Sequence, residues 1–239
     1  LSPRLIRARR RLMNPSFFSG FSFFPNIGLR FFQREVTAMA GRKQKTRPHA
    51  GRLRIVAGNW RSRLLDIADV EGLRPTSERI RETLFNWLAP GIAGTRCLDL
   101  FAGTGALGLE ALSRGARSVV FVERSPVAAK QLENNIAILG GASSAADVVR
   151  GDALDYLRHA ADDAFDIVFL DPPFADDRLS ETCRLLAARG LLAAGARVYL
   201  EQDRAKPAPR LPDNWTIKKN KTAGNVRYLL AMVEEDDER

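Results

Sequence analysis

Short apolar runs that alternate with helical segments constrain the fold of this chain more than any other feature of its sequence. These runs, each a candidate strand, cover residues 96–101, 118–123, 147–150, 165–170 and 197–201. A chain that alternates strands with helices builds a parallel sheet, because each helical connection returns it to the same end of the sheet. The sequence therefore predicts an α/β fold with helices on both faces of a mostly parallel sheet.

Two further pairs of strands are predicted at the ends of this series. Residues 52–65 contain two short strands around the Gly-Asn pair at 58–59, which is typical of a hairpin turn. Residues 215–220 and 226–233 are joined by a short turn and predict an antiparallel hairpin at one edge of the sheet. With this edge hairpin the sheet has seven predicted strands, and the first pair is a small N-terminal extension.

A helix is predicted between the first hairpin and the sheet, within residues 74–91. Thr76 or Ser77 can cap its start, because a side-chain hydroxyl there accepts a bond from a free backbone N–H. Pro90 and the glycine after it end the helix. A later helix is opened by the Ser-Pro pair at 125–126, since proline is well tolerated at the first helical position.

The positive charge of the chain is concentrated at its N-terminus. The net charge is +9, and residues 1–54 hold 13 Lys and Arg against one acid, whereas residues 55–239 hold 24 against 27 acids. Such a basic arm is either a solvated tail or a surface that neutralises phosphates, and the second interpretation is favoured for residues 41–58, where arginines alternate with apolar residues. We expect a disordered or misassigned extension at 1–38, with a targeting peptide as the alternative, a basic arm and hairpin at 39–73, and the main domain at 74–239.

Several classes of protein are excluded by composition. No apolar run approaches the roughly 18 residues that a membrane span requires. The two cysteines, Cys97 and Cys183, have no disulfide or metal-ligand spacing, and the two histidines, His49 and His159, have no metal-ligating neighbours. We therefore expect a soluble cytoplasmic protein with free thiols, with no metal and no membrane partner.

A glycine-rich loop follows the first strand of the sheet in DLFAGTGALGLEAL, residues 99–112. Gly103 and Gly105 let the backbone approach a ligand, and the helix that follows offers free N–H groups. Glu123, at the end of the next strand, can accept hydrogen bonds from ribose hydroxyls. Nicotinamide dehydrogenases use the same spacing, but Asp99 would repel their pyrophosphate, whereas the ammonium group of S-adenosylmethionine attracts a carboxylate. The loop therefore favours S-adenosylmethionine over a dinucleotide.

Acids also follow two later strands. Asp152 in RGDALDY can accept a bond from an adenine amino group, and it can equally cap the helix that follows. The strand at 165–170 runs into Asp171, two prolines and an aromatic residue. The prolines stop the strand and hold this segment rigid, so that the acid is displayed at the strand's end. Ligands of open parallel sheets bind at such carboxyl ends.

Four motifs occur in order along the chain: LDLFAGTGALGLEALSRGA, FVERSP, GDALDY and DPPF. They resemble the motifs of class I methyltransferases that act on exocyclic amines. With LRIVAGNWRSRLL, GLRPTSERIRETLFNWL and KKNKTAGNVRYLL added, residues 51–233 resemble the family of bacterial 16S ribosomal RNA guanine-N2 methyltransferases that modify guanine 966. The resemblance implies a Rossmann-like class I methyltransferase fold and S-adenosyl-L-methionine as the cofactor. It also implies a monomeric enzyme whose partner is 16S rRNA in the small ribosomal subunit or an assembly intermediate.

The resemblance also implies roles for the matching residues. Those expected to bind the cofactor are Asp99, Phe101, Gly103, Thr104, Gly105, Glu123, Arg124, Asp152 and Ala153, together with Arg74 and Thr76 before the first helix. The expected catalytic residues are Asp171, Pro172 and Phe174. The residues expected to contact the substrate RNA are Pro173 and the arginines of the basic hairpin, Arg52, Arg54, Arg61 and Arg63.

The chemistry of an exocyclic amine accounts for the Asp-Pro-Pro-Phe motif. The lone pair of a guanine N2 amine is conjugated with the ring and is poorly available for attack on a sulfonium methyl. The Asp171 carboxylate and the Pro172 carbonyl can each accept one N–H, which frees the lone pair. Phe174 can stack on the base, a contact worth roughly 1–3 kcal/mol.

Two other functions stay open on the sequence. Methyltransferases of other amines share the DPPF motif, so adenine N6, cytosine N4 and glutamine N5 are alternative acceptors. A non-catalytic RNA-binding or nucleotide-binding module is the alternative from a different class. Lys218, Lys219 and Lys221 either hold RNA or keep an edge strand solvated.

Overall fold

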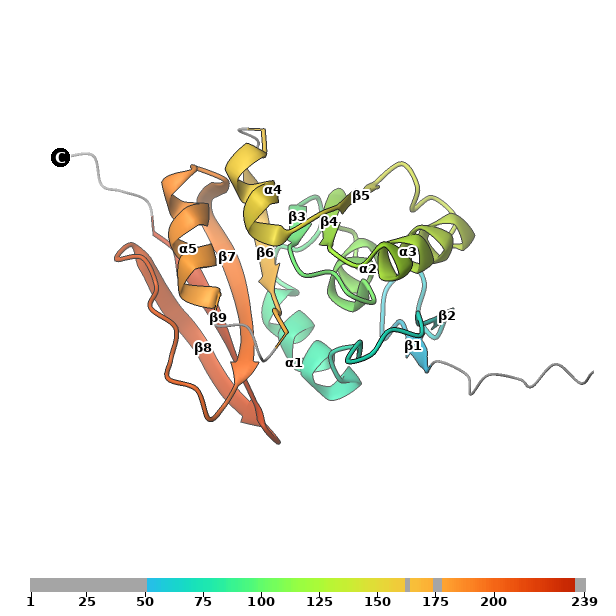
Figure 1. The fold of residues 1–239 in the computed structure, drawn as a ribbon, viewed down its shortest axis with the longest axis horizontal. Coiled ribbons are helices and arrows are strands. Elements are labelled where there is room, and N and C mark those ends of the chain that lie inside the picture. Colours follow the sequence, from blue (N-terminus) through green and yellow to red (C-terminus); the bar gives the residue numbers. More distant parts are fainter. Residues whose placement is uncertain (1–50, 162–163, 174–177, 235–239) are drawn as a thin grey trace, which may run out of the picture. The chain divides into compact units, whose positions relative to one another are not determined.

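The apolar runs of the sequence form a mixed sheet, drawn in Figure 1. The computed structural model describes residues 51–161, 164–173 and 178–234, and within these ranges the sheet has seven strands in the order β5-β4-β3-β6-β7-β9-β8. These strands are β3 (Arg96–Asp99), β4 (Ser118–Glu123), β5 (Ala146–Arg150), β6 (Phe165–Leu170), β7 (Leu192–Asp203), β8 (Trp215–Ala223) and β9 (Val226–Val233). The neighbours from β5 to β7 pair in parallel, and β9 pairs antiparallel with β7 and β8. The predicted parallel sheet with an antiparallel edge hairpin is confirmed.

Some predictions concern residues that the structure does not describe. Residues 1–38 and Phe174 lie outside the described ranges. Among the residues that are described, no helix has the length and apolar character needed to cross a membrane.

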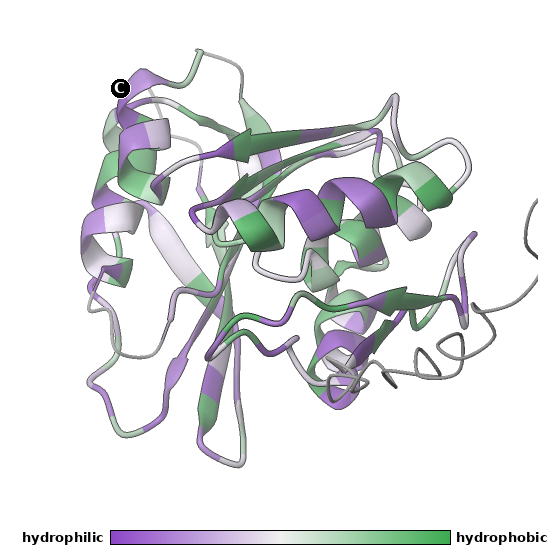
Figure 2. Cartoon of the chain, turned by 45° about the vertical axis from the view of Figure 1, so that its right-hand side comes forward, coloured by the Kyte–Doolittle hydropathy of each residue, from purple (hydrophilic) through white to green (hydrophobic). Residues whose placement is uncertain are grey.

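Helices cover both faces of the sheet and bury a separate core on each. The helices are α1 (Glu78–Leu88), α2 (Ala106–Ser113), α3 (Pro126–Ile138), α4 (Ala153–His159) and α5 (Leu179–Ala188). One core joins α1, α2 and α3 to the sheet, and the other joins α4 and α5 to it. The side chains of successive strand residues, such as Cys97 and Leu98, pack in opposite cores, because side chains point alternately to the two faces of a sheet. The helices carry both hydrophobic and hydrophilic residues, as expected of helices with one buried face (Figure 2).

Helix α1 begins and ends within the predicted segment. Its N-cap is Ser77, whose hydroxyl accepts the Ile80 N–H at 3.3 Å, and the helix ends at Leu88. The predicted cap at Thr76 or Ser77 is confirmed, with Ser77 as the N-cap and Glu78 as the first helical residue. Arg74 and Thr76 lie just before the helix, and Pro75 disfavours helical backbone in the residue before it.

Several strand boundaries differ from the predictions, and β8 for example extends to Ala223. Strand β3 ends at Asp99, two residues before the predicted end, because the chain there turns into the glycine loop. Strand β7 starts at Leu192, well before the predicted residue 197, since Leu192 pairs with Phe165 of β6 ahead of an irregularity in the register. These differences leave the order of the elements unchanged.

The basic hairpin consists of β1 (Arg52–Arg54) and β2 (Leu64–Asp66), which pair antiparallel with Leu53 opposite Leu65. The connection between the two strands is long, and it packs against the end of α2. Gly58 adopts a φ of +83°, and a Cβ added to it would lie 1.9 Å from the Ser113 carbonyl oxygen. Only glycine allows this close approach, so the connection is fixed on α2.

Candidate active site

Two acids predicted from the sequence, Asp99 and Asp171, lie at the point in the sheet where the order of the strands reverses. Strands β3 and β6 are neighbours in the centre of the sheet, while the following strands lead outward on opposite sides. Asp99 ends β3 and is paired with Phe169, and Asp171 comes directly after β6. Open α/β sheets bind their ligands at this switch point, so the position agrees with a binding site.

The glycine loop lies between β3 and α2. Gly103 and Gly105 have φ values of +52° and +75°, which favour glycine. A Cβ on Gly105 would lie 2.4 Å from Leu132 Cδ1, so a larger residue does not fit there. Thr104 is buried and Phe101 is half-buried. The loop therefore leads directly into the N-terminus of α2, where the first backbone N–H groups have no carbonyl partner within the helix.

Asp99 lies beneath this loop with 2% of its surface exposed. The Gly108 N–H donates to Asp99 Oδ2 at 2.9 Å, which fixes the carboxyl against α2. The pKa of Asp99 is raised to about 7, mainly by burial and also by the charges of Asp171 and Glu123, while the Gly108 bond opposes this rise. A cation bound beside Asp99 would favour its ionised form.

Glu123 holds two backbone segments together at the end of β4. Its Oε2 accepts the Gly103 N–H at 2.8 Å, and its Oε1 accepts the Ser125 N–H at 2.6 Å. Each carboxylate oxygen has a further lone pair, so Glu123 can still accept a hydrogen bond from a ligand hydroxyl. Arg124 is exposed beside it.

Asp152 is the N-cap of α4. Its Oδ1 accepts the N–H groups of Leu154 at 2.9 Å and Asp155 at 3.4 Å, and its Oδ2 pairs with Arg178 at 2.8 Å. The capping role predicted as one alternative is confirmed, and a bond to adenine stays a prediction. Ala153 follows as the buried first residue of the helix.

Asp171 contacts the segment before α1. The Thr76 hydroxyl donates to Asp171 Oδ2 at 3.0 Å, although 95 residues separate them in sequence. Removal from bulk water raises the pKa of Asp171 to about 6, and the Thr76 bond opposes this rise. Pro172 is buried, Pro173 is exposed, and Arg74 is exposed near the start of α1.

A second acid, Glu201, lies beside Asp171 and was missed in the sequence. Leu170 of β6 pairs with Leu200 of β7, so the next residues of the two parallel strands face the same side. Glu201 is 4% exposed, and the Tyr199 hydroxyl donates to its Oε2 at 2.6 Å. Burial, and then the charge of Asp171, raise the pKa of Glu201 to about 8. An acid at the end of an apolar strand, YLE, was the signal that could have revealed it.

The three carboxyls of Asp99, Asp171 and Glu201 form an acidic cluster on one face of the sheet. In the described ranges, the hydrogen bonds to them come from neutral groups: the Gly108 N–H, the Thr76 hydroxyl and the Tyr199 hydroxyl. Buried carboxyls without a cation are unfavourable unless they are protonated or a positive ligand binds. S-adenosylmethionine carries both an ammonium and a sulfonium charge, so the residues present fit this cofactor.

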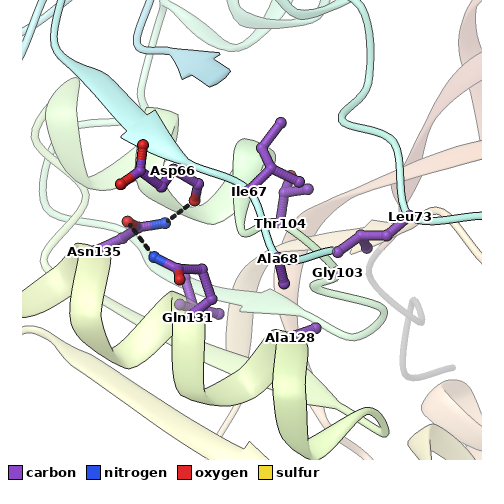
Figure 3. Close-up of a pocket in the computed structure, with 10 residues that line it drawn as sticks. Asp66, Ile67, Ala68, Leu73, Gly103, Thr104, Ala128, Gln131 and Asn135 are labelled. Carbon is purple, nitrogen blue, oxygen red and sulfur yellow. Dashed lines mark hydrogen bonds between the residues drawn. The ribbon is translucent and has the colours of Figure 1, made fainter. Parts of the chain in front are cut away.

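A small pocket borders the glycine loop from the side of the basic hairpin (Figure 3). Gly103 and Thr104 line it together with Leu73 and residues of α3, and Asn135 donates to the Asp66 carbonyl at 2.9 Å. Asp99, Glu123 and Asp171 are not among its lining residues. The pocket thus marks where the segment after β2 crosses the loop, not the acidic cluster.

The arginines assigned to RNA lie on the hairpin surface. Arg52 and Arg54 are exposed in β1, while Arg61 and Arg63 are exposed in the connection to β2. Arg52 lies 3.7 Å from Asp66, and Arg54 lies 3.7 Å from Glu78. Such exposed pairs are weak, so these arginines can exchange them for phosphate contacts.

Solved structures share this fold. The candidate methyltransferase yhhF from Escherichia coli is 43% identical, with a TM-score of 0.71 over 77% of this chain and 99% of its own. A candidate methylase from Haemophilus influenzae is 42% identical, with a TM-score of 0.67 over 77% of this chain and 100% of its own. The fold is that of the class I methyltransferases.

Sequence comparisons identify the family. The family model described as "Conserved hypothetical protein 95" matches residues 53–232. The ribosomal RNA small subunit methyltransferase D of Haemophilus influenzae is 44% identical over 79% of this chain and 98% of its own length. The Escherichia coli K12 protein of the same name is 43% identical over 82% of this chain and 98% of its own. The chain belongs to this family, that of the ribosomal RNA small subunit methyltransferases D.

Proposed function

We propose that this protein transfers a methyl group from S-adenosylmethionine to the exocyclic N2 amine of a guanine in 16S ribosomal RNA, of the guanine 966 type. The observation that carries the proposal is Asp171, displayed at the end of β6 beside the glycine loop and the acidic cluster. The names of the related proteins, ribosomal RNA small subunit methyltransferase D, support the ribosomal substrate. The partner is then the small subunit or an assembly intermediate, which the protein meets in the cytoplasm as a monomer.

The residues of this chain prepare the amine for attack. When bound, S-adenosylmethionine supplies a methyl group on a positively charged sulfur. Asp171 Oδ1, the oxygen that is not bonded to Thr76, accepts one N–H of the amine, and the Pro172 carbonyl accepts the other. These two bonds direct the nitrogen lone pair at the methyl group, so that the N–C bond forms as the C–S bond breaks. Asp171 then takes the proton that the nitrogen loses.

Other residues hold and orient the two reactants. Asp99 attracts the ammonium group, Glu123 accepts from the ribose, and the free N–H groups at the start of α2 contact the carboxylate of the methionine part. Phe101, Thr104, Arg124, Asp152, Ala153 and Arg74 complete this proposed cofactor site. The base must leave its stack to reach Asp171, and Pro173 and Phe174 are the residues proposed to contact it.

Mapping the methylated nucleoside tests the proposed substrate. Small ribosomal subunits that lack the modification, incubated with the protein and methyl-labelled S-adenosylmethionine, are expected to yield N2-methylguanosine after digestion. Label in N6-methyladenosine, N4-methylcytidine or protein would replace the proposed acceptor with another amine. RNA binding without any label would identify a non-catalytic module instead.

Affinity for the cofactor is expected to depend on pH through Asp99. Because its pKa is raised to about 7, Asp99 is neutral below that pH and loses its attraction for the ligand ammonium. Affinity for S-adenosylhomocysteine, which keeps the ammonium but lacks the sulfonium charge, should fall by up to about tenfold per pH unit below 7. Calorimetric titration between pH 5.5 and about 8 measures this dependence.

Two variants assign the dependence to Asp99. Asp99→Asn should bind S-adenosylhomocysteine weakly at every pH, with most of the slope lost. Asp171→Asn should keep a pH slope of this kind but shift it to lower pH, because loss of the Asp171 charge lowers the pKa of Asp99. Wild-type affinity in Asp99→Asn would remove Asp99 from the ammonium site.

A further inference from the structure

A buried arginine joins the start of α1 to α2. Arg81 is 1% exposed, its Nε donates to the Thr76 carbonyl at 3.1 Å, and its Nη1 lies 3.3 Å from Glu110 Oε2. A buried guanidinium is costly unless it is paired and hydrogen-bonded. Both of these partners are therefore needed to keep Arg81 in this position.

Glu110 connects α2 to two other parts of the structure. It is fully buried, and its two carboxylate oxygens accept the N–H groups of Val56 at 2.8 Å and Ala57 at 2.9 Å, both from the connection of the basic hairpin. Oε1 also pairs with Arg114 at 2.8 Å, and Oε2 pairs with Arg81. One carboxylate thus fixes the hairpin, α1 and α2 relative to one another.

Thr76 lies between this network and Asp171. Arg81 holds its backbone carbonyl, and its hydroxyl donates to Asp171 Oδ2. The backbone conformation of Thr76 sets the direction of its hydroxyl, since a threonine side chain has few rotamers. A change in the position of the carbonyl therefore changes the contact with Asp171.

We propose that Arg81 and Glu110 are positioning residues that orient the Asp171 carboxylate through Thr76 and tie the basic hairpin to the same network. The proposal rests on the proposed function, in which Asp171 accepts an N–H of the target amine. It assigns Thr76 to the acceptor acid, whereas the sequence predicted a contact with the cofactor. RNA seated on the hairpin is then held in a fixed relation to Asp171.

A double-mutant cycle on kcat tests the connection. Thr76→Val keeps the shape of the side chain but removes the hydroxyl, and Arg81→Lys keeps the charge but cannot bridge Thr76 and Glu110. Each variant alone should lower kcat about tenfold, the effect of removing one hydrogen bond to a charged group. The kcat of the double variant should lie within about twofold of the kcat of Thr76→Val, because Arg81 acts through the hydroxyl that is already absent.

Three further measurements separate positioning from folding or cofactor binding. Thr76→Ser, which keeps the hydroxyl, should retain kcat within about threefold. Arg79→Lys makes the same change at an exposed position of α1 and should leave kcat and the melting temperature unchanged. Affinity for S-adenosylhomocysteine should stay within about threefold in Thr76→Val and in Arg81→Lys. If Arg81→Lys does not fold, Glu110→Gln takes its place in the cycle, because it removes the charge that holds the guanidinium.

The outcomes that overturn the proposal differ from those that overturn the proposed function. Additive losses of kcat in the cycle, or a loss of cofactor affinity as large as the loss of kcat, would show that Arg81 does not act on Asp171 through Thr76. If the wild-type protein methylates an amine other than guanine N2, the proposed substrate is wrong. The cycle is then measured on that acceptor, and it still decides the role of Arg81.

Discussion

Replacing Asp171 with alanine is expected to lower kcat by about 100- to 1000-fold, the range seen when a preorganised group is removed from the reacting centre. In the proposed reaction the Asp171 carboxylate accepts an N–H from the target amine. Without it, the nitrogen lone pair stays conjugated with the ring. Asp171 lies beside Glu201 and Thr76 and is not assigned to the cofactor. Affinity for S-adenosylmethionine should therefore change only a few fold.

Two further variants define the role of Asp171 in this experiment. Asp171→Asn keeps one oxygen acceptor and should retain more activity than Asp171→Ala, although it lacks the negative charge. Asp147→Ala removes an exposed carboxyl from the edge strand β5 and should leave kcat unchanged. Methyl incorporation under saturating substrates gives kcat, and calorimetric titration gives the cofactor affinity. Equal losses of both in Asp171→Ala would contradict the assignment of Asp171 to the amine.

The central strands could be predicted because they are buried on both faces. In β6, Ile167, Val168, Phe169 and Leu170 are all fully buried, and a parallel strand covered by helices must be a continuous apolar run. The start of β7 could not be predicted, since its alanines and glycine have low strand propensity. This start pairs with the sheet only through Leu192 opposite Phe165 of β6, because β9 pairs with β7 only from Arg197 onward.

The acids at strand ends could be predicted for a topological reason. Parallel strands end at the same edge of the sheet, so Asp99, Glu123 and Asp171 had to lie near one another once the fold was recognised. Their contacts could not be predicted in the same way. The bond between Thr76 and Asp171 joins residues 95 positions apart, which only the packing of α1 on the sheet brings together.

The burial of Arg81 and Glu110 was not predicted, because a charge in an amphipathic helix usually faces solvent. Arg81 nevertheless precedes Leu84 and Phe85 by three and four positions, so it lies on the apolar face of α1. Glu110 occurs in an eight-residue helix that is buried throughout. A charge at such a position needs a buried partner, and this is the signal that could have revealed both residues.

The hairpin arginines are expected to set the affinity for RNA without setting the choice of base. Binding to phosphates releases counterions, and each phosphate neutralised adds about 0.7 to 0.9 to the log–log dependence of affinity on salt. Changing Arg52, Arg54, Arg61 and Arg63 to alanine should raise KM for the small subunit on the order of 10- to 100-fold at low salt. The salt dependence should flatten by roughly that slope for each phosphate that the variant no longer neutralises. The methylated nucleoside should stay the same, because Asp171 and its neighbours are unchanged.

A charge-matched variant separates phosphate binding from net charge. Changing Arg117, Arg184, Arg204 and Arg210 to alanine removes the same charge from exposed positions outside the hairpin, so KM and its salt slope should stay close to those of the wild type. Methyl incorporation is measured at several salt concentrations for both variants and the wild type. If the hairpin variant keeps the wild-type slope, the arginines do not contact phosphates. If KM and its salt slope change equally in the two variants, the effect comes from the overall positive charge of the protein. The hairpin would then not be the RNA contact through which Glu110 and Arg81 link bound RNA to Asp171.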